Sequence, residues 1–165
     1  MFTRILITLL LPAFLFCSFT VAHSKEYTQS QSLTGLPTVK IYFDVNMGIP
    51  EKLVLRLSLI DKTISQLKDD GVQPEVVIAF RGKASKFVTN GKGYVEKEDL
   101  AVKDQVHKWL ESFTNQGIHM EQCLIAANLL GIAPEDVRSE LTVTKNGFIS
   151  MAAYQQRGFS MVPMD

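Results

Sequence analysis

The chain has 165 residues, with 17 basic and 17 acidic side chains and a formal net charge of zero at pH 7. A balanced charge without blocks of one sign gives no indication of nucleic acid or an anionic membrane surface as a partner. The length is sufficient for one domain with one hydrophobic core.

The first 22 residues have the pattern of a secretory signal peptide, with an early cation, an apolar middle and small residues at the end. We expect cleavage after Ala22, with Ser24 as the second choice. An uncleaved membrane anchor is the alternative, but the apolar run at 5–16 is short for a span of about 20 residues and contains Pro12.

Cleavage after residue 22 predicts a periplasmic or secreted protein of 143 residues with a net charge of −1, not associated with the membrane. Cys17 would be removed, which leaves Cys123 as the single cysteine. No internal disulfide can then form, so this thiol is either buried and inert or exposed and reactive. Residues 23–37, rich in Ser, Thr and Gln, are predicted to be a flexible segment before a domain at 38–165.

The first half of the domain reads as strand, helix and strand. Alternating apolar and polar residues predict a strand at 39–45, and leucines and isoleucines spaced by three and four predict a helix over 51–69, followed by Gly71 as a left-handed cap. The continuously apolar run 76–80 is typical of a strand covered on both faces. Short joints between these elements predict a βαβ unit and a parallel sheet.

The second half continues the alternation. Helices are predicted over residues 84–88, 98–113, 124–130 and 148–157, and strands over residues 118–122, 141–144 and 159–162. This order predicts one three-layer α/β domain whose mostly parallel sheet has about five strands.

Cys123 is the main candidate for chemistry because it lies at the predicted junction of a strand and a helix. Open α/β sheets place their sites at the carboxyl ends of strands, where backbone N–H groups and the helix dipole favour a thiolate over a thiol. Arg81, at the end of a strand expected beside this one, is a candidate partner of the thiolate. The alternative is a buried cysteine that acts as a small apolar side chain.

His119 and Glu121 precede Cys123 at intervals of two, so in a strand all three side chains point to one face. Glu121 is therefore a further candidate for catalysis, and a metal triplet is an alternative. Against both, the first and third positions lie about 13 Å apart along a strand, and soft-metal sites normally gather ligands from several elements. We predict no metal and no cofactor, and interpret His107 as a surface histidine.

Three stretches resemble the DsrE/DsrF-like proteins of sulfur metabolism. KIYFDVN resembles the family's first strand, VVIAFRG its second, and EQCLIAANLLGI its cysteine segment, in which Gly-Ile follows eight residues after the Cys. Further on, AYQQRGFSMVP is similar to the closing helix and strand. The resemblance covers about residues 38–163 and implies a flavodoxin-like α/β/α fold, usually assembled into trimers or hexamers.

In this family the matching cysteine carries sulfur as a persulfide between proteins, so the resemblance implies that Cys123 accepts sulfur from, or passes it to, a partner protein. Those carriers act in the cytosol, whereas this chain begins with an export signal. The first hypothesis is therefore an exported sulfur-handling protein. The second is a non-enzymatic module that binds a small ligand or assembles with other proteins, and metal binding comes third.

Overall fold

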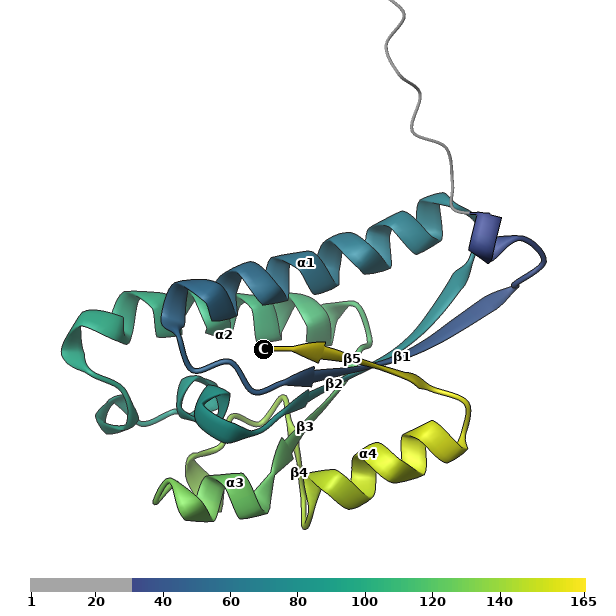
Figure 1. Cartoon of the computed structure of the whole chain (residues 1–165). Coiled ribbons are helices and arrows are strands. Elements are labelled where there is room, and N and C mark those ends of the chain that lie inside the picture. Colours follow the sequence, from purple (N-terminus) through teal and green to yellow (C-terminus); the bar gives the residue numbers. More distant parts are fainter. Residues whose placement is uncertain (1–30) are drawn as a thin grey trace, which may run out of the picture.

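The computed structural model describes residues 31–165 (Figure 1). The predicted signal peptide at 1–22 and residues 23–30 of the segment after it lie outside the described residues, so export and cleavage stay predictions. Residues 31–37 contain one turn of 3₁₀ helix, η1 (Gln31–Leu33), and Leu33 packs against the core. Within residues 31–165, no helix is both long and apolar enough to cross a membrane.

Five strands form one sheet in the order β4-β3-β2-β1-β5, and every neighbouring pair is parallel. The strands are β1 (Thr38–Val45), β2 (Gln73–Phe80), β3 (His119–Cys123), β4 (Thr142–Thr144) and β5 (Ser160–Met164). The predicted five-strand α/β domain is thereby confirmed. β2 begins three residues before the predicted start because residues 73–75, which lie outside the apolar run, pair with residues 38–40 of β1.

Helices cover both faces of the sheet (Figure 1). They are α1 (Pro50–Asp69), α2 (Leu100–Asn115), α3 (Leu124–Leu129) and α4 (Gly147–Gln156). The first two pack side by side on one face, and the last two lie on the other (Figure 1). The predicted short helix at 84–88 belongs to a 3₁₀ segment, η2 (Gly82–Val88), and further 3₁₀ turns are η3 (Lys92–Tyr94), η4 (Lys97–Asp99) and η5 (Pro134–Asp136).

The main core lies between the sheet and the pair α1 and α2. The leucines and isoleucines whose spacing predicts this helix form one stripe, and all five are buried: Leu53, Leu57, Ile60, Ile64 and Leu67. Leu55 and Leu59 lie beside that stripe and are exposed, at 53% and 38%. The period of the helix turns them away from the sheet.

The other face of the sheet is more polar. Strand alternation sends Tyr42 and Asp44 of β1 to this face, where both are buried, while Ile41, Phe43 and Val45 enter the main core. A small apolar cluster of Tyr42, Val77 and Ala79 packs here against Met151 and Tyr154 of α4. The polar groups of this face therefore need partners within the protein.

A buried lysine holds the loop that follows η2. Lys103 of α2 is only 2% exposed, and its ammonium donates to Thr89 Oγ1 at 2.6 Å and to the carbonyl of Gly91. Burial lowers the pKa of Lys103. These bonds tie the loop to α2, and residues 137 and 89 form an antiparallel bridge beside it.

His107 is half-buried, which corrects its interpretation as a surface residue. Its Nδ1 lies 3.2 Å from Nη1 of Arg138. Because a guanidinium can only donate, Nδ1 accepts and the ring is neutral in this contact. Nε2 is buried. Arg138 lies 31 residues after His107 in the sequence. The residue pattern of α2 alone therefore gave no sign that another segment covers this side of the helix.

Acid should destabilise the protein in part through His107. Burial, and then the charges of Arg138 and Lys103, lower the pKa of His107 below its ordinary value. The unfolded chain therefore binds this proton at a higher pH than the folded protein does, so unfolding becomes easier as the pH falls through about 6.5. We expect His107→Asn to lose less unfolding free energy than the wild type between about pH 7.5 and pH 5. Urea denaturation at both pH values measures this, and equal losses would contradict it.

Candidate functional site

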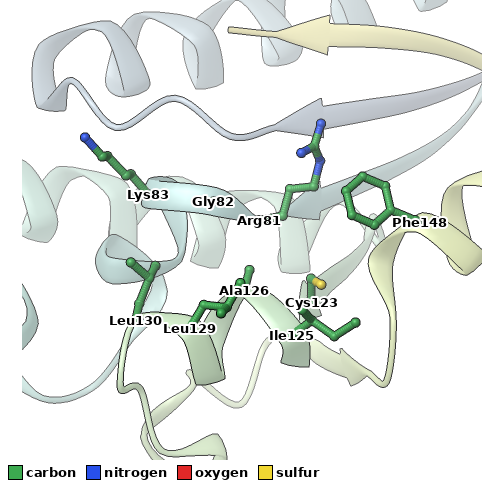
Figure 2. Close-up of a pocket in the computed structure, with 9 residues that line it drawn as sticks. All are labelled: Arg81, Gly82, Lys83, Cys123, Ile125, Ala126, Leu129, Leu130 and Phe148. Atoms are coloured by element: carbon green, nitrogen blue, oxygen red, sulfur yellow. The ribbon is translucent and has the colours of Figure 1, made fainter.

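A pocket of about 270 Å³ lies where β2 and β3 end, between η2, α3 and the first turn of α4 (Figure 2). Its floor includes Cys123, and Ile125 and Leu129 of α3 face Phe148 of α4 across it. Leu129 is 82% exposed, so the pocket opens to solvent. This position, outside the carboxyl ends of parallel strands, is the usual place for a ligand site in such sheets.

Cys123 lies where the sequence predicts, as the last residue of β3 and the residue that caps α3. It is 5% exposed, so the thiol is buried in the protein while it lines the pocket. Its sulfur accepts a hydrogen bond from the backbone N–H of Gly147 at 3.3 Å. Gly147 is the first residue of the ten-residue helix α4, so the amino end of a second helix also faces the sulfur.

Gly147 is a functional candidate that the sequence analysis missed. A Cβ placed on it would lie 3.0 Å from Cys123 Cβ and 3.2 Å from the sulfur, which is tighter than most such contacts. A side chain at this position therefore requires Cys123 to shift by a few tenths of an ångström, whereas glycine brings the amide to the sulfur without that shift. The signal in the sequence is Asn146 directly before it, because that side chain caps α4 by accepting from the N–H of Phe148 at 3.0 Å.

We expect Gly147→Ala to lower the unfolding free energy by about 1–3 kcal/mol through overpacking, and to slow alkylation of Cys123 by iodoacetamide, because the amide must move away from the sulfur. Gly93→Ala is the matched control, since no atom lies within 4 Å of a Cβ built there. Urea denaturation and alkylation rates measure both effects. If Gly147→Ala and Gly93→Ala had equal unfolding free energies and equal alkylation rates, the close approach of Gly147 to Cys123 would affect neither stability nor the thiol.

Arg81 follows β2, next to β3 as predicted, but its charge is paired with Asp44 of β1. Nε of Arg81 donates to Oδ1 at 2.5 Å and Nη2 donates to Oδ2. Asp44 is 2% exposed, and its hydrogen bonds raise the pKa of Arg81. The guanidinium also lies 5.3 Å from the ring centre of Phe148 and extends away from Cys123 (Figure 2).

Asp44 was not singled out from the sequence, although a carboxylate within an apolar strand is a signal that it has a partner. Arg81 and Cys123 thus border the same pocket, and the two are not in direct contact as an ion pair.

Glu121 is buried at 6% exposure on the same face as His119, as the strand period predicts. His119 Nε2 lies 3.2 Å from Oε1, and the hydroxyl of Ser150 donates to Oε2. Burial, and then the charge of Glu121, raise the pKa of both Tyr42 and Tyr154. This carboxylate therefore joins β3 to α4, the helix whose first residue touches the sulfur of Cys123.

Within residues 31–165, no group of three or more His, Cys, Asp or Glu side chains is arranged to hold a metal ion. His119, Glu121 and Cys123 share one face of β3, yet they do not converge on a common point.

Ser150→Ala should lower the unfolding free energy by about 1–3 kcal/mol, because it removes a donor from the buried carboxylate of Glu121. Ser58→Ala is a suitable control, since its hydroxyl donates to the Leu55 carbonyl on the exposed side of α1. Urea denaturation of both variants measures the difference. If Ser150→Ala lost no more unfolding free energy than Ser58→Ala, the carboxylate of Glu121 would have enough hydrogen-bond donors without Ser150.

Comparisons with known proteins support the fold only. No family model matches the chain. It is 28% identical over 127 residues to an uncharacterized protein of Aquifex aeolicus (strain VF5), covering 76% of this chain and 56% of that relative. The chain therefore spans little more than half the length of the curated relative it matches. A protein of unknown function from Methanobacterium thermoautotrophicum has a similar structure, with a TM-score of 0.57 at 13% identity over 76% of this chain and 98% of the other.

Proposed function

We propose that the protein is an exported member of the DsrE/DsrF-like proteins and that Cys123 accepts and relays sulfur as a persulfide. The observation that carries this proposal is the sulfur of Cys123 in the pocket, 3.3 Å from the N–H at the start of α4. A hydrogen-bond donor and the positive end of a helix dipole favour negative charge on that sulfur, and the thiolate is the form that attacks sulfane sulfur.

The proposed step is an exchange without net oxidation. The Cys123 thiolate attacks the outer sulfur of a persulfide donor, the S–S bond of the donor breaks, and the donor leaves as a thiolate that takes up a proton. The reverse exchange with an acceptor thiol passes the sulfur on. Because Cys123 is the single cysteine of residues 23–165, no neighbouring thiol converts the persulfide into an internal disulfide.

Cys123 is 5% exposed, as an inert core cysteine would also be, and it is the pocket against its sulfur that supports the reactive role. The same burial limits the access of oxidants to that sulfur. In this proposal Gly147 stabilises the charged sulfur, Arg81 and Asp44 fix the ends of β2 and β1 beside the pocket, and Glu121 acts as a positioning residue for α4.

The surface around the pocket supports association with other proteins. Phe148 and Ile149 at the start of α4 are 59% and 68% exposed, and Ile125 and Leu129 on α3 are 41% and 82% exposed. Clustered exposed apolar side chains are typical of interaction sites. They are suited to a sulfur donor or acceptor protein, or to copies of this chain in the homo-oligomer, a trimer or hexamer, that the resemblance implies.

The test is the intact mass of mature protein isolated from its native compartment without reductant, and again after incubation with inorganic polysulfide. We expect wild-type protein to gain the mass of one sulfur atom, and cyanide or reductant to remove it. Cys123→Ser should gain none, because serine cannot form a persulfide. A wild-type protein that gains no sulfur, with a thiol that does not react with iodoacetamide until the chain unfolds, would refute the proposal.

The apolar walls of the pocket favour a second candidate, a non-enzymatic module that binds a small ligand. In that case Cys123→Ser would leave ligand binding and assembly unchanged. This separates the second function from the first, in which the sulfur atom is indispensable.

A further inference from the structure

The pocket presents no free charge among the described residues that line it. The guanidinium of Arg81 is bound by both carboxylate oxygens of Asp44. The ammonium of Lys83 extends away from Cys123 (Figure 2), and the alkyl part of that side chain fills the space over Gly48 that a Cβ would need. Both cations therefore contribute their backbone and alkyl atoms to the pocket, while their charged groups lie elsewhere.

The remaining walls are hydrocarbon. Ile125, Ala126 and Leu129 of α3 and the following Leu130 form one side, and Phe148 forms the other. The volume of about 270 Å³ is below that of most pockets for drug-sized ligands, about 300–1,000 Å³. It exceeds the roughly 150 Å³ of an engineered apolar cavity that binds benzene. The space therefore suits a single ring or a short branched chain.

We infer that this pocket binds a small, uncharged, apolar organic group, and that one of the two sulfur-exchange partners of Cys123 is a neutral organic persulfide, R–S–SH, or its thiol, while the other can be a protein. The sulfur chemistry rests on the proposed function, whereas the binding of the apolar group does not. R occupies the space between α3 and Phe148, and the outer sulfur lies against Cys123. The Cys123 thiolate attacks that outer sulfur, the S–S bond of the donor breaks to leave a persulfide on Cys123, and R–S⁻ takes up a proton and leaves as R–SH.

The neutral charge of the ligand distinguishes it from anionic sulfur donors of similar shape. An anionic donor would lose hydration in a pocket where the charge of Arg81 is already paired with Asp44 and the ammonium of Lys83 extends away from Cys123. A neutral body gains from burial against the same walls. The pocket should therefore discriminate by charge between compounds of equal shape.

The experiment uses two unreactive compounds with the same body, benzyl methyl sulfide and (benzylthio)acetate. Each is titrated into the mature protein while iodoacetamide alkylates Cys123, and methyl NMR shifts of the isoleucines and leucines follow binding independently of the thiol. We expect the neutral sulfide to protect Cys123 at a concentration at least about tenfold lower than the carboxylate, because a carboxylate is costly to desolvate.

Leu129→Asp should weaken protection by the neutral sulfide about fivefold, because it removes apolar contact at the mouth of the pocket. Leu129 is 82% exposed, so this change should leave the fold intact. Leu55→Asp is the matched control, since Leu55 is an exposed leucine on α1 at the opposite face of the sheet. That variant should bind the sulfide as the wild type does.

The inference would be overturned if both compounds protected Cys123 from alkylation equally. It would also be overturned if benzyl methyl sulfide gave neither protection nor methyl NMR shifts. The two proposals fail separately. If polysulfide loads Cys123 but the sulfide does not bind, the sulfur carrier stands and the ligand class is wrong. If the sulfide binds but no donor loads Cys123, the binding of an apolar group stands, and the persulfide chemistry and the proposed function fail together.

Discussion

The hydrogen bond from the Gly147 amide to the sulfur of Cys123 is the contact on which the geometry of the pocket depends. It fixes the start of α4 against the end of β3, and through α4 it places Phe148 opposite α3. Two further contacts keep the helix in this position, the bond from Ser150 to Glu121 and the packing of Tyr154 on Tyr42 at 5.5 Å between ring centres. The thiol thus receives its polar environment from backbone and helix rather than from a charged side chain.

The ion pair between Arg81 and Asp44 has a complementary effect. It satisfies a carboxylate that is buried on β1 and at the same time removes a cation from the pocket. A buried carboxylate without a partner would strongly destabilise the folded protein, so Asp44 needs the guanidinium of Arg81 beside it. The consequence for chemistry is a thiol surrounded mainly by hydrocarbon, which favours neutral ligands.

A second set of polar contacts stabilises the segment on the other side of the pocket. Lys103 binds the loop after η2 through Thr89 and Gly91, and Arg138 binds Glu140 and the ring of His107. Since η2 begins at Gly82 on the wall of the pocket, the stability of this region and the shape of the site are connected. The titration of His107 acts on that region rather than on the thiol.

The sequence by itself determined the elements and the place of the thiol. Periods of two and of three to four residues are local, so they predict β1, α1 and the junction at Cys123, and they place His119, Glu121 and Cys123 on one face. Only the tertiary structure decided which groups meet. Arg81 and Asp44 are separated by 37 residues, and Gly147 and Cys123 by 24. These contacts follow from the strand order β4-β3-β2-β1-β5 and from the path of α4. No local sequence pattern specifies the strand order or that path, because both depend on how whole elements pack against one another.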